Sequence, residues 1–148
     1  MSKASLTQAL HAAQRQHPRR TATVFNGRRT SYEDFAARVS RAAAGIQQRG
    51  IKAGDRVGIL SLNSDRYLEL FFAIWWCGGV VNPVNVRWSA NEIAYSLDDC
   101  ATAILFVDDN FVALVPELVK LSKCLKTVVY CGDGSAPPGM FSHEQLIS

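Results

Sequence analysis

Histidine and carboxylate side chains are the first candidates for chemistry in this 148-residue chain. His11, His17 and His143 show no H-x-x-x-H spacing and have no nearby cysteine, so we expect surface or terminal positions rather than metal binding. Asp108-Asp109 precedes a predicted helix, where capping explains the pair. Asp98-Asp99 follows a predicted helix, and the sequence gives it no favourable role there. We therefore assign no catalytic and no metal-binding residue.

A phosphate-binding loop is the next kind of site for which we searched the sequence. Gly132-Asp133-Gly134 is the only local glycine pattern, but no third glycine follows and it does not lead directly into a helix. The stretch GDGSAPPG over residues 132–139 is instead typical of a linker. The sequence has no G-x-S-x-G motif. Trp75-Trp76 could line a ligand site, but inside an apolar helix we interpret it as core.

Composition indicates one globular domain without a nucleic acid partner. Hydrophobic residues make up 48% of the chain, and a domain of this size buries roughly two-thirds of its unfolded surface. The formal net charge of +3 is too weak a bias to indicate nucleic acid binding. Basic residues near the N-terminus are interpreted as a solvated surface. They are Arg15, Arg19, Arg20, Arg28 and Arg29.

Cysteine usage and hydropathy indicate a cytoplasmic protein. Cys77, Cys100, Cys124 and Cys131 form no C-x-x-C pair and lie in apolar contexts, so we expect them to be buried and reduced. The N-terminus has no continuous apolar segment, so we expect no signal peptide. The longest apolar run, residues 70–81, is too short for a membrane span, which needs roughly 20 residues.

Strand and helix patterns alternate along most of the chain. An Asn26-Gly27 turn predicts a β-hairpin over residues 21–30. Cap residues predict helices that begin after Ser5, Ser31, Ser64 (or Asn63), Ser89 and Ser142. A further predicted helix contains Pro116, which marks either a kink or the start of a second helix. Predicted strands cover residues 56–62, 80–84, 103–107 and 127–131. The order favours an α/β fold: a mostly parallel sheet with helices on both faces, plus an N-terminal hairpin.

Four of these segments resemble a family of adenylate-forming enzymes. The segments are residues 30–35 (TSYEDF), 50–57 (GIKAGDRV), 76–85 (WCGGVVNPVN) and 106–108 (FVD). In this order and spacing they are similar to the opening of the acyl-CoA synthetases, also called fatty-acid–CoA ligases of the AMP-binding superfamily. The resemblance implies an N-terminal α/β subdomain of the large domain over residues 1–131, then a linker and the start of a further helix over 132–148.

The resemblance implies a two-step ligase. A fatty or aromatic carboxylate attacks the α-phosphate of MgATP, giving acyl-AMP, and coenzyme A then displaces AMP to form a thioester. The family's Ser/Thr- and Gly-rich phosphate loop, its metal-binding glutamate and its C-terminal lysine have no match in the 148 residues. We therefore expect a chain truncated before the phosphate loop, inactive alone and without tight binding of ATP, Mg²⁺ or coenzyme A. The resemblance leaves a homodimer open.

Arg87 is the one residue with a substrate hypothesis. It follows a predicted strand end in the loop before Ser89, and family members carry an arginine near this point, close to the nucleotide end of coenzyme A. A guanidinium suits a phosphate in charge and geometry. We predict that Arg87 contacts a phosphate of coenzyme A, with an exposed loop arginine as the simpler alternative.

Two other classes of function stay open from the sequence. The chain could be a free-standing truncated relative that acts as a non-catalytic interaction module, since a cut domain exposes apolar surface unless a partner covers it. It could also be an unrelated nucleotide-binding α/β domain, for which we find no phosphate loop.

Overall fold

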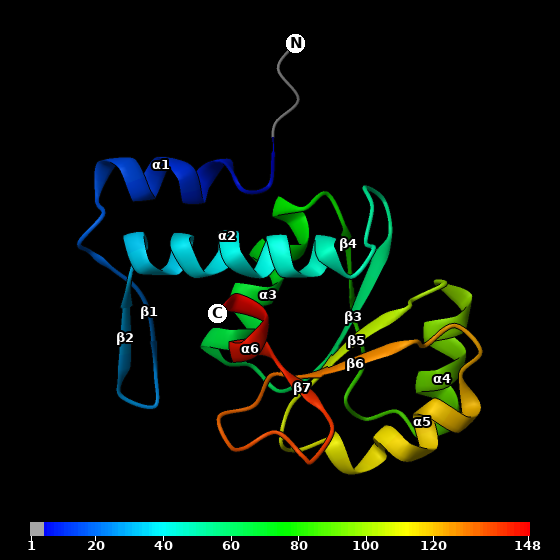
Figure 1. The fold of residues 1–148 in the computed structure, drawn as a ribbon. Helices are drawn as coiled ribbons and strands as arrows, with labels where there is room; N and C mark the ends of the chain where they lie inside the picture. The colour runs from blue at the N-terminus through cyan, green and yellow to red at the C-terminus, as the bar shows by residue number, and fades with distance from the viewer. Residues whose placement is uncertain (1–4) are drawn as a thin grey trace.

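A five-stranded parallel sheet forms the centre of the protein (Figure 1). The computed structural model describes residues 5–148. The strands lie in the order β4-β3-β5-β6-β7. They are β3 (Arg56–Leu60), β4 (Val80–Pro83), β5 (Ile104–Val107), β6 (Thr127–Tyr130) and β7 (Phe141–Ser142). The predicted parallel sheet is confirmed.

Helices cover both faces of this sheet, as predicted (Figure 1). One face carries α2, α3 and α6, and α1 packs on α2. The other face carries α4 and α5, which is preceded by the short 3₁₀ helix η1. The bounds are α1 (Gln8–Gln16), α2 (Tyr32–Gln48), α3 (Asp65–Trp76), α4 (Ala90–Asp99), η1 (Val112–Leu114), α5 (Val115–Leu121) and α6 (His143–Ile147).

The two sides of β5 join two separate parts of the core. Ile104 and Phe106 pack in the cluster under α2 and α3, whereas Leu105 and Val107 pack in the cluster under α4 and α5. A strand buried on both faces is continuously apolar, which explains the run Ile-Leu-Phe-Val. Full burial of a side chain such as Phe106 contributes about 1.5–3 kcal/mol to folding.

The predicted hairpin and most predicted helix starts are confirmed. β1 (Thr21–Phe25) pairs with β2 (Arg28–Ser31), and the turn residues Asn26 and Gly27 both have positive φ, 48° and 77°. Ser31 and Ser64 accept hydrogen bonds from the backbone N–H three residues later, and Ser89 and Ser142 form complete capping boxes. These local signals operate within one turn, so sequence reveals them.

Three local expectations need correction or completion. α1 begins at Gln8, and the side chain of its N-cap residue Thr7 makes no capping hydrogen bond. The predicted capping box of Ser5 and Gln8 is therefore wrong. The Ser5 hydroxyl instead hydrogen-bonds the Thr7 hydroxyl at 2.8 Å. Pro116 lies in the first turn of α5, which confirms a second helix start. The two-residue strand β7 was not predicted, because a strand this short has no readable periodicity.

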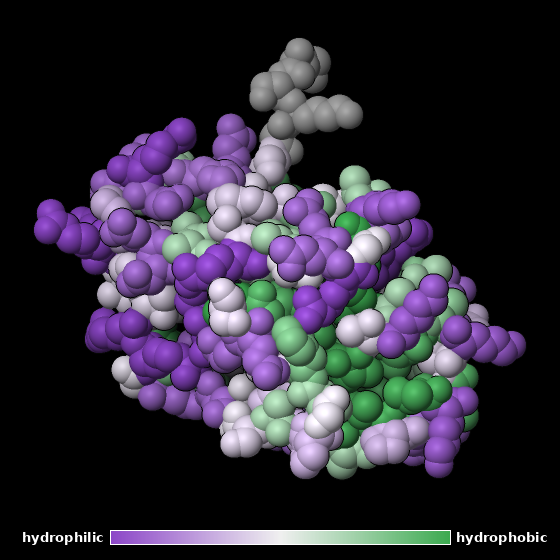
Figure 2. Space-filling model, viewed as in Figure 1, coloured by the Kyte–Doolittle hydropathy of each residue, from purple (hydrophilic) through white to green (hydrophobic). Residues whose placement is uncertain are grey.

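Surface character differs between parts of the molecule. Hydrophilic side chains cover the hairpin, α1 and α2, whereas hydrophobic side chains gather over β6 and α5 (Figure 2). Val119 and Leu121 of α5 are 53% and 38% exposed. No helix within residues 5–148 has the length and hydropathy needed to cross a membrane. All four cysteines are free; Cys77 and Cys131 are buried as predicted, and Cys100 and Cys124 are half-buried.

Candidate functional site

The carboxyl edge of the sheet contains a polar cleft where the strand order changes direction. From β3 the chain passes outward to β4, and from β5 it passes the other way to β6 and β7. In open parallel sheets, ligands bind at such a switch point, outside the carboxyl ends of the strands. A cleft of about 320 Å³ lies there, lined by the segments that follow β3, β5 and β6. This cleft is therefore the first candidate for a ligand-binding site.

Asp108 joins the ends of β3 and β5, and both of its carboxylate oxygens accept internal hydrogen bonds. Its buried carboxylate accepts hydrogen bonds from the Leu62 N–H at 2.8 Å and the Ser61 hydroxyl at 3.1 Å. The N–H and side-chain amide of Asn110 donate to it at 2.9 and 3.1 Å. Asp108 therefore fixes the cleft floor. The predicted helix-capping role is wrong, because η1 has Phe111 as its N-cap.

Asp109 is enclosed by the loop Gly132-Asp133-Gly134. The Tyr130 hydroxyl donates to its carboxylate, and the Asp133 N–H donates at 3.0 Å. A Cβ on Gly132 would stand 2.2 Å from Asp109 Oδ2, and one on Gly134 would stand 2.8 Å from Oδ1. The loop is thus a close cradle for an internal carboxylate, not a plain linker and not a phosphate loop. Burial and this carboxylate both raise the pKa of Tyr130.

Asp98 ties α4 to the end of α5. Its carboxylate accepts the Ser122 hydroxyl at 2.6 Å and the N–H groups of Lys123 and Cys124, each at 3.0 Å. The Ser122 hydroxyl, ahead of the other donors, lowers the pKa of Asp98. This contact supplies the role that the sequence did not reveal for Asp98, since the donors lie 24–26 residues further along the chain.

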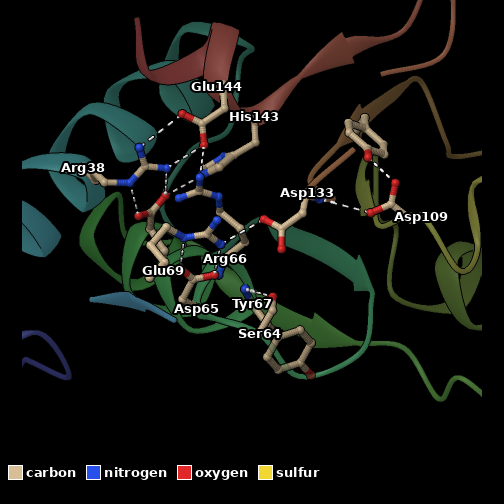
Figure 3. Close-up of polar contacts among 12 residues, drawn as sticks. Arg38, Ser64, Asp65, Arg66, Tyr67, Glu69, Asp109, Asp133, His143 and Glu144 are labelled. Carbon is tan, nitrogen blue, oxygen red and sulfur yellow. Dashed lines mark hydrogen bonds and ion pairs between the residues drawn. The ribbon is translucent and has the colours of Figure 1, made fainter. Parts of the chain in front are cut away.

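A cluster of charged side chains lies behind the cleft, where α2, α3 and α6 meet (Figure 3). Arg38 of α2 forks between two carboxylates, Glu69 at 2.6 and 3.1 Å and Glu144 at 2.8 and 3.1 Å. Arg66 adds an ion pair to Glu144 at 2.6 Å. His143 Nε2 lies 2.5 Å from Glu69 Oε1. We call these five side chains the α6 cluster.

Burial distinguishes two members of the α6 cluster. Glu69 and His143 are each only 2% exposed. Burial acts to raise the pKa of Glu69, but hydrogen bonds from His143 and Arg38 outweigh it and the pKa is lowered. The expectation of a surface histidine is wrong for His143, because α6 folds back onto α2 and α3. A hint was present: Glu69 stands between Leu68 and Leu70 and is followed by a continuous apolar run within the helix.

The hairpin is linked to the same region through Arg28. Its guanidinium donates to Asp65, the first residue of α3, at 2.7 and 2.8 Å, and to Asp133 at 2.9 Å. The remaining histidines lie elsewhere: His11 packs on Trp76 at 4.3 Å between ring centroids, and His17 is exposed at the end of α1. No group of metal-binding side chains occurs within residues 5–148.

Arg87 lies outside the cleft, beyond β4 at the sheet's edge. It is exposed in the loop between β4 and α4, and its N–H donates to Asn85 Oδ1 at 3.0 Å. Among the described residues its guanidinium has no hydrogen-bond or ion-pair partner. Further along the chain, Trp88 and Tyr95 are 38% and 73% exposed and line a shallow hollow at α4. The loop thus presents an exposed guanidinium without an internal partner among the described residues.

Comparisons with known proteins place these features in a family. A family model described as AMP-binding enzyme matches residues 10–145. The long-chain-fatty-acid–CoA ligase of Thermus thermophilus is 34% identical over 119 residues, covering 80% of this chain and 22% of that protein. A fatty acid–[acyl-carrier-protein] ligase of Streptomyces coeruleorubidus is 33% identical over 131 residues, covering 88% of this chain and 24% of that protein.

A solved structure agrees with the fold. The structure named as a long-chain-fatty-acid CoA ligase from Rhodopseudomonas palustris superposes with a TM-score of 0.89 at 31% identity. The match covers 99% of this chain and 37% of that one. The fold is that of the adenylate-forming enzymes. The chain belongs to the AMP-binding enzyme family, and it spans about a fifth to a quarter of the length of these curated relatives.

Proposed function

We propose that the chain is the N-terminal part of an AMP-forming acyl-CoA synthetase that activates a carboxylic acid. The family match over residues 10–145 is the observation that carries this proposal. The complete enzyme forms acyl-AMP and pyrophosphate from the acid and MgATP, and then forms a thioester by displacement of AMP. A fatty acid is the first choice of substrate, since the two relatives described above are named for fatty acids. An aromatic acid is the alternative.

In this proposal residues 1–131 are the α/β subdomain of the catalytic domain, and residues 132–148 lead out of it. They act as a scaffold behind the reacting groups and are inactive alone. The charges near the cleft support this assignment. Arg28, Arg38 and Arg66 are each paired with carboxylates, so these cations are not available to a triphosphate. ATP and Mg²⁺ are bound by the remainder of the enzyme.

Arg87 is the residue of this chain that we assign to a substrate. Its guanidinium is exposed and unpaired among the described residues, so ion pairing does not compete with a ligand. Phosphate groups accept two parallel hydrogen bonds from a guanidinium. We assign Arg87 to a phosphate of coenzyme A. We place the complete enzyme in the cytoplasm, where the four free cysteines of this chain stay reduced.

The products of the full-length protein test the proposal. Mass spectrometry of reactions with ATP, Mg²⁺ and a panel of fatty and aromatic acids should detect AMP and a thioester. Coenzyme A and an acyl carrier protein are supplied in separate arms, because one relative is named for a carrier protein. AMP with a thioester supports the ligase. ADP formation, or AMP formation that does not depend on an acid, contradicts it.

A non-catalytic interaction module is the second candidate. The exposed apolar side chains on α5 and over β6 favour it, because a partner would cover them (Figure 2). Size-exclusion chromatography with light scattering separates the two candidates. Aggregation or dye binding of the 148-residue chain fits a fragment of a larger domain, and a monodisperse, cooperatively unfolding chain fits a module.

A further inference from the structure

α6 depends on the rest of the protein for its position. It comprises only His143–Ile147, which is far shorter than a helix that is stable alone in water. Its capping box fixes its start locally, but its orientation is set by tertiary contacts. Leu146 packs against α2 at Gly45. Near the start of the helix stands the α6 cluster, in which His143 and Glu144 meet Arg38, Arg66 and Glu69.

The buried part of the α6 cluster, Glu69 with His143, costs free energy to desolvate. Buried ion pairs are often no more stable than well-packed apolar residues of similar volume. In addition, Nδ1 of His143 is buried without a hydrogen-bond partner in the described part of the chain, a condition that native proteins mostly avoid. Stability alone therefore does not account for the charges.

Fixed geometry does account for them. The fork of Arg38 reaches Glu69 of α3 and Glu144 of α6 at once, and His143 holds the other side of Glu69. Bidentate pairs of this kind have narrow angular tolerance. Satisfying all of these bonds at once therefore restricts the placement of α6 relative to α2 and α3 more tightly than apolar packing would do by itself.

We propose that His143 is a positioning residue of the ligase, acting through Glu69 to fix α6 and thereby the polypeptide that continues from it. This inference rests on the proposed function, in which the segment that handles ATP follows α6. It predicts an effect confined to acid activation. α6 follows β7, whereas Arg87 follows β4, and these strands are the opposite edges of the sheet.

Two substitutions at one position separate a hydrogen-bonding role from a packing role. In the full-length protein, His143→Gln keeps an N–H donor near the place of Nε2, whereas His143→Leu keeps apolar volume and removes the donor. Steady-state KM values for ATP and for coenzyme A are measured for both, with Glu69→Gln as a second disruption. Glu117→Gln, an exposed glutamate on α5, is the matched control.

We expect His143→Leu and Glu69→Gln to raise the KM for ATP about tenfold, the scale set by a lost charge-assisted bond or a small displacement of a reacting group. His143→Gln and the control should match the wild type, and the KM for coenzyme A should stay constant in all variants. Equal behaviour of His143→Leu and His143→Gln, or parallel changes in both KM values, overturns the inference.

Hydrogen exchange of the same full-length variants distinguishes a local effect on α6 from a general loss of folding. Faster exchange in α6 alone in His143→Leu, with α2 and α3 still protected, supports positioning. Loss of protection throughout α2 and α3 overturns it in favour of a general folding role. A wild type without acid-dependent turnover removes the proposed function, and the exchange comparison then tests only whether His143 fixes α6.

Discussion

Leu146 of α6 rests directly on Gly45 of α2. A Cβ at residue 45 would stand 2.5 Å from Leu146 Cγ and 2.7 Å from its carbonyl oxygen. Glycine normally weakens a helix interior, so its presence in the middle of α2 has a packing reason. The close approach lets the last helix lie flat on α2, with the α6 cluster beside it.

Gly45→Ala should therefore destabilise the protein, although the same change favours an ordinary helix. We expect a loss of about 1–3 kcal/mol in the free energy of unfolding, as for an overpacked core position. Urea denaturation measures it, and Ala44→Ser, on the exposed side of the same helix, is the control. Adding Leu146→Ala should relieve only part of the strain at Gly45, because the carbonyl oxygen remains. A stabilised Gly45→Ala variant would show that α6 does not pack as described.

Asp98→Asn should weaken the contact between α4 and the end of α5, and the resulting loss of stability should depend on pH. The folded pKa of Asp98 lies below its unfolded value of about 3.9. Its stabilisation is therefore present above that value and is lost as pH falls through the folded pKa. At pH 7 we expect the free energy of unfolding to fall by about 1 kcal/mol. The effect is modest because the carboxylate is partly exposed to solvent.

Urea unfolding at pH 7 and at pH 3 measures this difference. The difference in the free energy of unfolding between wild type and Asp98→Asn should be smaller at pH 3. Asp99→Asn serves as the control, since Asp99 is exposed on the same helix end. An equal gap at both pH values would mean that the carboxylate charge of Asp98 has no part in the contact.

Tyr130→Phe should loosen the loop that encloses Asp109. The hydroxyl is the donor to that carboxylate, and its loss leaves an acceptor with one bond fewer, which costs about 1–3 kcal/mol. Because the folded pKa of Tyr130 is raised, its stabilisation is complete below the unfolded pKa of about 10 and is lost as pH rises further. Absorbance titration of tyrosinate should lose its highest-pH step in the variant, and Tyr95→Phe, on an exposed tyrosine, should keep it.

These contacts show what sequence could and could not reveal. The turn at Asn26-Gly27 and the cap of Ser89 with Glu92 were predictable, because each signal lies within four residues. The partners of Asp98 and Arg38 were not, since they lie up to 26 and 106 residues away and no local pattern encodes them. His143 was misplaced for the same reason: its burial depends on how α6 returns to α2.

Arg87→Ala in the full-length enzyme should raise the KM for coenzyme A about tenfold and leave acid activation unchanged, because a charge-assisted phosphate contact is lost. Arg87→Lys should recover part of the affinity through charge alone. Arg41→Ala, at an exposed position on α2, is the control. An unchanged KM for coenzyme A in Arg87→Ala would leave Arg87 as a surface residue.

The central claim is that the complete protein activates a carboxylic acid with ATP. Isotope exchange between pyrophosphate and ATP tests it most directly, since this exchange requires a reversibly formed acyl-AMP and no coenzyme A. We predict acid-dependent exchange by the full-length protein and none above background by residues 1–148. Exchange by the 148-residue chain would contradict its role as scaffold, and no exchange by the full-length protein with any fatty or aromatic acid would contradict the ligase.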